Sequence, residues 1–213
     1  VDPVAACVLL EQWLRAPDPR APTRSRVSML PFSQYDVHGS LRHLITLDGM
    51  TGEQVRELLE RAQRYLRRPG EIPAHGRSLA GITVGNIFTE PSTRTRSSFE
   101  LAAKRLGADV LNLEIQLSSR VKGETVLDTI YTLQAMAVDV FVIRDAEPGV
   151  CQYVAEHVQP HVAVLSAGEA HLSHPTQGLL DALTILQYKG GFRDLVVAVV
   201  GDVRHSRVAR SAY

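Results

Sequence analysis

Residues 81–107, GITVGNIFTEPSTRTRSSFELAAKRLG, predict a buried strand, a polar turn and a helix in direct succession. The first eight residues are apolar and partly β-branched, which is typical of a strand covered on both faces. Over residues 98–106 the apolar side chains follow helical spacing, and Gly107 is a common residue at a helix end. A strand that leads directly into a helix is the basic unit of a parallel α/β sheet.

The turn between this strand and this helix contains Ser92, Thr93, Arg94, Thr95 and Arg96. At a helix N-terminus, free backbone N–H groups and the positive end of the helix dipole favour a bound phosphate. Hydroxyl groups add donors, and arginine adds a planar fork of N–H groups. A serine or threonine before a helix often serves only as an N-cap, but a cap requires one oxygen acceptor and no cation. The turn therefore predicts an anion site.

The same alternation continues along the chain. Residues 51–66 have the spacing of an amphipathic helix that covers a sheet. Strands are expected at 82–88, 109–113, 138–143 and 162–166, and helices at 98–106, 126–136 and 150–157. This order predicts an α/β fold with a parallel sheet and helices on both faces, with ligands at the carboxyl ends of the strands.

Two polar groups follow later strands. Arg144 comes directly after the apolar run 138–143, where it could bond an anion or a carbonyl oxygen, or form a salt bridge with Asp145. The residues alone favour neither alternative. His174 and Gln177 lie where a loop opens another helix, with proline at its first turn. A lone histidine is usually structural, so spacing alone assigns it no chemistry.

Two further segments are informative. Residues 118–125, SSRVKGET, have the polar composition of a solvated, mobile connector. Residues 195–200, LVVAVV, predict a strand, and GDVRHSRVARS after it predicts a turn and the start of a helix. The segment lacks the glycine fingerprint for dinucleotides and the Walker lysine loop, which argues against NAD and ATP.

Composition excludes several classes of protein. Lys+Arg and Asp+Glu are balanced at 23 each, so no bulk field favours nucleic acid or an anionic membrane. The two cysteines, Cys7 and Cys151, lie far apart without metal-ligand spacing, so neither a disulfide framework nor a metal site is expected. The apolar runs are too short to span a membrane. Residues 1–38 are rich in proline and arginine and are expected to form a poorly packed extension.

From about residue 41 onward, these motifs resemble the aspartate and ornithine carbamoyltransferase family. The STRTR turn at 92–96, the HPTQ motif at 174–177 followed by a Leu-Leu-Asp run, and KGET at 122–125 carry the resemblance. It implies a carbamoyl-phosphate-binding domain over 39–175 and an interdomain helix over 176–190. Residues 191–213 would then begin a second, Rossmann-like domain that binds aspartate.

The resemblance also implies the site residues. Glu90-Pro91 and the HSR sequence at 205–207 favour the aspartate branch, since ornithine enzymes usually have Gly-Asp-Gly-Asn-Asn at the latter point. Aspartate would be bound by Arg207 and by Lys122 from a neighbouring subunit. The residues implied in catalysis are Arg94, Thr95, Lys122, Arg144 and His174. Those implied in binding carbamoyl phosphate are Ser92, Thr93, Arg94, Thr95, Arg144, His174, Gln177 and, from the neighbouring subunit, Ser118.

The implied activity is transfer of the carbamoyl group of carbamoyl phosphate to the amine of L-aspartate in pyrimidine biosynthesis, without metal or cofactor. A cytoplasmic homotrimer with shared active sites is implied, as are possible regulatory or dihydroorotase-like subunits. Ornithine or another amine acceptor, and a non-catalytic scaffold subunit, are the alternatives. Because the chain reaches only the start of the second domain, little turnover is expected from these 213 residues alone.

Overall fold

The computed structural model describes residues 32–67, 70–71, 75–114 and 125–212. In this part of the chain, one sheet is formed by four parallel strands. They are β1 (Thr83–Phe88), β2 (Asp109–Glu114), β3 (Val140–Asp145) and β4 (Ala163–Glu169), in the order β2-β1-β3-β4. The predicted parallel α/β sheet is confirmed.

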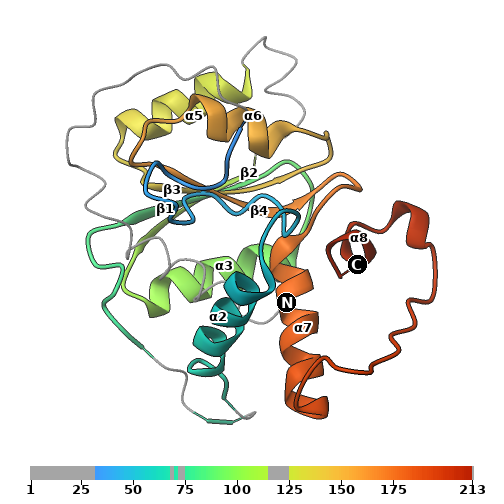
Figure 1. Ribbon diagram of the computed structural model, residues 1–213. Helices are drawn as coiled ribbons and strands as arrows, with labels where there is room; N and C mark the ends of the chain where they lie inside the picture. Colours follow the sequence, from blue (N-terminus) through green and yellow to red (C-terminus); the bar gives the residue numbers. More distant parts are fainter. Residues whose placement is uncertain (1–31, 68–69, 72–74, 115–124, 213) are drawn as a thin grey trace.

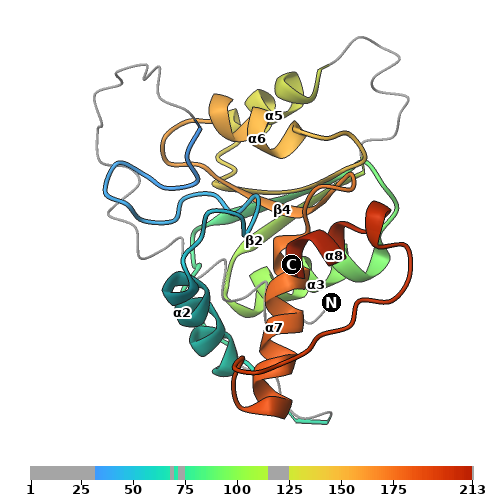
Figure 2. The ribbon, with the colours of Figure 1, turned by 45° about the vertical axis from the view of Figure 1, so that its right-hand side comes forward.

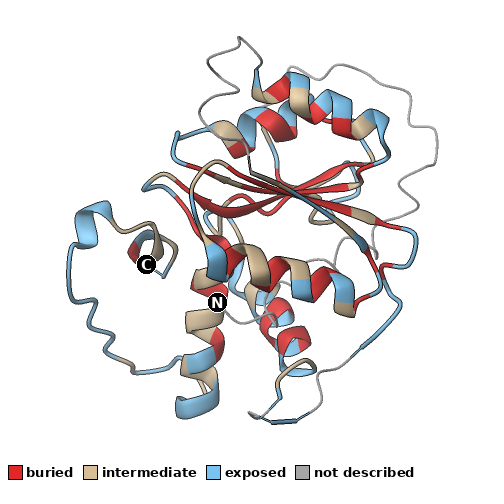
Figure 3. Cartoon of the chain, turned by 180° about the vertical axis from the view of Figure 1, so that it is seen from behind, coloured by how far each residue is buried: buried red, intermediate tan, exposed pale blue. Residues whose placement is uncertain are grey.

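Helices cover both faces of this sheet (Figure 1). On one face lie α5 (Val126–Ala135) and α6 (Val150–His157). On the other lie α2 (Gly52–Gln63), α3 (Thr93–Arg105) and α7 (Pro175–Lys189). Strands β1, β3 and β4 are almost wholly buried between the two layers (Figure 3), which is why β3 and β4 follow continuous apolar runs rather than alternating ones. The edge strand β2 has exposed side chains.

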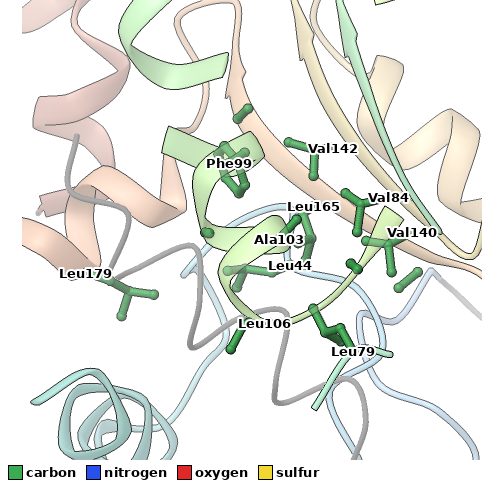
Figure 4. Close-up of a cluster of buried hydrophobic side chains, with 14 of the residues drawn as sticks. Leu44, Leu79, Val84, Phe99, Ala103, Leu106, Val140, Val142, Leu165 and Leu179 are labelled. Carbon is green, nitrogen blue, oxygen red and sulfur yellow. The ribbon is translucent and has the colours of Figure 1, made fainter. Parts of the chain in front are cut away.

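Each face of the sheet has its own core. Val84 and Val142 lie with Phe99 of α3 in the larger cluster, shown in Figure 4. Ile87 and Phe141 belong to the cluster beneath α5 and α6. Full burial of one such side chain contributes about 1.5–3 kcal/mol, so these two clusters are the main source of the sheet's stability.

Local sequence signals explain where the helices begin. Thr51 forms a capping box with Gln54 at the start of α2, and Thr125 forms one with Asp128 at the start of α5. Helix α3 begins at Thr93, earlier than the residue 98 predicted from apolar spacing. Its first turn is polar and lies towards solvent, so the apolar pattern could not reveal it.

One edge of the sheet is extended by the segment before α2. The N–H of Leu44 donates to the carbonyl of Val164, and the N–H of Ser166 donates to the carbonyl of Leu44. The buried ring of His43 accepts the N–H of Val164 at Nδ1. Burial, reinforced by the neighbouring Arg42 guanidinium, lowers the pKa of His43 to about 3. This histidine is therefore a neutral acceptor that completes the edge of β4.

The C-terminal segment differs from the prediction. Residues 195–200 form no strand, and Val196 and Val200 are 99% and 94% exposed. A strand requires a hydrogen-bonded neighbour, and no described residue pairs with this run. The chain loops outward after α7 and returns through η1 (Val203–His205) to α8 (Arg207–Ala212), which packs beside α7 (Figures 1 and 2).

Two segments discussed from the sequence lie wholly or partly outside the described residues. The connector at 118–124 is not described, and only residues 32–38 of the expected extension are. Among the described residues, no helix combines the length and apolarity needed to cross a lipid bilayer.

Candidate active site

The strand order predicts where a ligand binds. From β1 the chain passes to β2 on one side, then crosses back to β3 on the other, so the connections diverge between β1 and β3. In parallel α/β sheets, ligands bind outside the carboxyl ends of the strands at such a point. Phe88 and Arg144 are register partners there, and the N–H of Thr89 donates to the carbonyl of Arg144 at 3.0 Å. The arginine and the polar turn after β1 are thus neighbours.

The polar turn begins helix α3 without a side-chain N-cap. Ser92 occupies the N-cap position of α3, yet its side chain makes no capping hydrogen bond. Thr93 and Arg94 are exposed on the first turn, whereas Thr95 is buried. The first turn of α3 contains no acidic residue. This arrangement favours the anion-binding interpretation over simple capping, because the hydroxyl that would serve as a cap is not used as one.

Arg144 is held across the site by two acceptors. Its Nε donates to Oε2 of Glu90 at 3.1 Å, and its Nη1 donates to the carbonyl of Ala167 at 3.3 Å. The ion pair with Glu90 therefore joins this guanidinium to the loop after β1. Burial and the nearby Arg207 lower the pKa of Arg144, against the opposing effect of Glu90. The group stays charged at neutral pH.

Arg207, at the start of α8, also pairs with Glu90. Its Nη2 donates to the same Glu90 oxygen at 3.2 Å, and its Nη1 donates to the carbonyl of Ala170 at 3.0 Å. Glu90 was not among the site residues predicted from the sequence. Its position beside the STRTR turn was the available signal, but only the tertiary structure shows that two distant arginines meet at its carboxylate.

Three side chains of the candidate site lie next to Gly168. A Cβ atom at this glycine would lie 3.2 Å from Nη1 of Arg144, 3.2 Å from Nε of Arg207 and 3.3 Å from Cδ2 of His174. Its φ of +114° is also a conformation that L side chains rarely adopt. The three side chains therefore converge on one small volume at the end of β4.

His174 is buried in this cluster and is neutral. Burial, followed by the charges of Arg144 and Arg207, lowers its pKa to about 3. Nδ1 lies 3.3 Å from the hydroxyl of Thr176. A neutral imidazole here can donate a hydrogen bond without adding a third positive charge.

The remaining predicted residues lie around this cluster or outside the description. Gln177, on the first turn of α7, donates its amide to Asp181 at 2.9 Å. The turn that carries Ser92 and Arg94 is joined to the cluster through Glu90. Ser118 and Lys122 lie outside the described residues. Within the described ranges, no three His, Cys, Asp or Glu side chains are grouped so as to hold a metal ion.

Together these features define an α/β protein with a cluster of arginine, histidine and hydroxyl side chains at the carboxyl edge of a parallel sheet. The family model described as "Aspartate/ornithine carbamoyltransferase, carbamoyl-P binding domain" matches residues 42–187. The chain belongs to this family.

Solved structures of aspartate transcarbamoylase from Trypanosoma cruzi are similar to the chain. The complex with carbamoyl phosphate and aspartate is 32% identical with a TM-score of 0.71, and the match covers 80% of this chain and 52% of that one. The complex with N-(phosphonacetyl)-L-aspartic acid (PALA) is 32% identical with a TM-score of 0.69, over 80% and 52% of the two chains. The ligand-free form is 31% identical with a TM-score of 0.67, over 79% and 53%. The chain thus spans about half the length of these relatives.

Proposed function

We propose that the chain provides the carbamoyl-phosphate side of an aspartate carbamoyltransferase active site, together with the first arginine of the aspartate side. The convergence of Arg144, Arg207 and His174 around Gly168 carries this proposal. Two cations and one neutral imidazole suit a substrate pair with a phosphate, a carbonyl and a carboxylate. The complexes of the similar T. cruzi enzyme with carbamoyl phosphate and aspartate support the same substrates.

The reaction is a direct acyl transfer. The neutral amine of aspartate attacks the carbonyl carbon of carbamoyl phosphate, a C–N bond forms, and the C–O bond to phosphate breaks. The amine loses a proton, and phosphate leaves as the second product. The chain contributes by holding both anionic substrates in one place and by stabilising charge that develops on the carbonyl and phosphate oxygens.

The resemblance to the family suggests a division of roles. Thr95, Arg144 and His174 donate to the carbonyl oxygen, while Gln177 holds the carbamoyl NH2. Arg207 binds the α-carboxylate of aspartate. The leaving phosphate is held by the α3 N-terminus and by Ser92, Thr93 and Arg94. Ser118 and Lys122 from a neighbouring subunit complete the site.

The neutral state of His174 supports its assigned role. With a pKa of about 3, the imidazole carries no charge at the pH of catalysis, so it polarises the carbonyl by a hydrogen bond and is not the base that accepts the amine's proton. A neutral donor also avoids repulsion with the two adjacent guanidinium groups. We therefore assign proton removal from the amine to the departing phosphate or to solvent.

Glu90 has a separate role in this proposal. One carboxylate joins the two guanidinium groups that would face the substrate anions. It limits repulsion between them and fixes their orientation. A substrate anion then either replaces the Glu90 carboxylate or binds beside it. In both cases an anion still balances the two guanidinium charges.

We further propose the domain division 39–175, 176–190 and 191–213, a homotrimer with shared sites, a cytoplasmic location and a place in pyrimidine biosynthesis. Regulatory or dihydroorotase-like subunits are compatible partners. Loop residues 118–125, which include Ser118 and Lys122, resemble the family's loop that enters a neighbouring site, and this similarity supports the trimer. Sedimentation of the protein with and without PALA tests it: a monomer under both conditions would contradict the shared site.

Ligand binding tests the function most directly. Calorimetric titration with carbamoyl phosphate, inorganic phosphate and PALA should show binding by the wild-type chain. Arg144→Ala should weaken it by about 10- to 100-fold, the loss expected for a charged hydrogen bond. Arg56→Ala, a change of an exposed arginine on α2, is the matched control.

Assays of carbamoyl transfer to aspartate and to ornithine, made with the full-length protein, separate the alternatives. Turnover with aspartate but not ornithine supports the proposed acceptor, and preference for ornithine would contradict it. Normal folding with no affinity for phosphate or carbamoyl phosphate would favour the non-catalytic scaffold. Low turnover by the 213 residues alone remains a prediction of the same assays.

A further inference from the structure

The contact between α7 and α8 is unusually close at one glycine. A Cβ atom at Gly178 would lie 2.6 Å from the carbonyl oxygen of Ser211 and 3.0 Å from its carbonyl carbon. Real Cβ atoms essentially never show the first distance, and the second is tighter than most real Cβ contacts. Both opposing atoms belong to the backbone of α8. The tip of Leu47, 3.0 Å away, can move aside, but the helix backbone can yield only if α8 shifts.

Ser211 also joins α8 to the turn that carries His174. Its Oγ accepts the backbone N–H of His174 at 2.7 Å and donates to the carbonyl of Arg207 at 3.1 Å. On α7, the N–H of Gly178 donates to the carbonyl of His174 at 3.1 Å, so the glycine and the histidine stand one helical turn apart. Gly178 and Ser211 are therefore the point where the two helices touch beside the site.

The contact between Gly178 and Ser211 also determines where the side chain of Arg207 lies. Arg207 and Ser211 are four residues apart on α8, so they lie on the same face of the helix. With Ser211 against Gly178, the guanidinium of Arg207 meets Glu90 and the carbonyl of Ala170 at 3.2 and 3.0 Å. Displacement of α8 away from α7 would lengthen these contacts together.

We propose that Gly178 and Ser211 are positioning residues that set the distance of α8 from α7 and thereby place Arg207 to bind the carboxylate of the amino-acid substrate. The assignment of the carboxylate rests on the proposed function, whereas the docking of α8 does not. The phosphate half of the site comes from the β1–α3 turn, whose place is set by β1 and α3 and not by this contact.

The chain offers a matched control for a glycine substitution. Gly52 lies in the first turn of α2, and a Cβ there would meet nothing within 4 Å. Both Gly52→Ala and Gly178→Ala replace a helical glycine with the best helix former. The two variants therefore share the change in helix propensity and differ in the steric conflict with α8.

Hydrogen exchange tests the docking without any ligand. Gly178→Ala should reduce the protection of the His174 amide and of the α8 amides, while Gly52→Ala leaves both as in the wild type. Wild-type protection in Gly178→Ala would overturn the proposal. If Gly178→Ala does not fold, Ser211→Ala, which removes only the hydroxyl, should give the same loss at the His174 amide, and its absence would overturn the proposal equally.

Binding tests the consequence for Arg207. In Gly178→Ala, affinity for PALA should fall by about 10- to 100-fold while affinity for inorganic phosphate stays at the wild-type value. In an Arg207→Ala background, Gly178→Ala should cause no further loss, because the group it positions is gone. Equal losses for both ligands, or additive losses in the double variant, would overturn the positioning role. Failure of the wild type to bind phosphate would instead reject the proposed function and leave the exchange result standing.

Discussion

The guanidinium groups of Arg144 and Arg207 donate to the same atom, Oε2 of Glu90, at 3.1 and 3.2 Å. Two like charges approach closely only when an anion lies between them. The residues come from the end of β3 and the start of α8, so this carboxylate links the sheet to the C-terminal segment. It is also the feature of the site that responds most directly to an added anion.

Removal of the Glu90 charge should make stability depend on phosphate. Glu90→Gln keeps the shape of the side chain but leaves the two guanidinium groups without a counter-ion. We expect a lower melting temperature in phosphate-free buffer, equivalent to about 1–3 kcal/mol, and a larger rise on adding phosphate than in the wild type. Glu60→Gln, at an exposed position on α2, is the control. Equal phosphate responses in both variants would show that Glu90 does not balance the arginines.

Gly168→Ala should weaken ligand binding far more than it lowers the free energy of unfolding. The new Cβ would meet Arg144, Arg207 and His174 at 3.2–3.3 Å and would also be strained at a φ of +114°. Gly201→Ala introduces similar strain at +128° with nothing within 4 Å, so it isolates the steric effect. The strain should cost about 1–3 kcal/mol in both variants, measured by urea unfolding. Only Gly168→Ala should lose PALA binding.

The free energy of unfolding should depend on pH through His43 and His174. Both have pKa values lowered from 6.5 to about 3, so between these values the unfolded chain binds more protons than the folded chain. Stability is therefore fully present above about pH 6.5 and falls as the pH is lowered towards 3. The slope should approach about 1.4 kcal/mol per pH unit for each histidine.

Urea unfolding of His43→Asn at several pH values measures the contribution of His43. The asparagine oxygen can accept the N–H of Val164 without titrating, so the slope between pH 6 and 4 should fall by about one proton equivalent. His75→Asn, at an exposed position, should leave the slope unchanged. A wild-type slope in His43→Asn would mean that another group causes the acid instability.

Arg94 should affect binding without affecting stability. Its side chain is exposed on the first turn of α3, so Arg94→Ala should change the free energy of unfolding by no more than about 0.5 kcal/mol. Phosphate affinity should fall by about 10- to 100-fold, and turnover of the complete enzyme by several orders of magnitude. Titration calorimetry beside a urea melt measures both quantities. Unchanged affinity would remove Arg94 from the phosphate site.

Several elements could be predicted from local sequence because the causes are local. Strand β1 and the turn after it are encoded within residues 81–96, where a β-branched apolar run leads to a group of hydroxyl and guanidinium side chains. Such runs, alternating with amphipathic helices, leave a parallel sheet as the way to bury both faces. The start of α3 was placed too late, because a polar first turn lacks the apolar spacing on which that prediction relied.

The sequence by itself determined the alternation of strands and helices, the group of hydroxyl and guanidinium side chains at the start of α3, and the family. Only the tertiary structure decided that Glu90 joins Arg144 to Arg207, that Gly168 leaves room for the site, and that residues 195–200 form no strand. The physical reason is the range of the interactions. Propensity, capping and apolar spacing act within a few residues, whereas ion pairing, close approach and strand pairing depend on which distant segments the fold brings together.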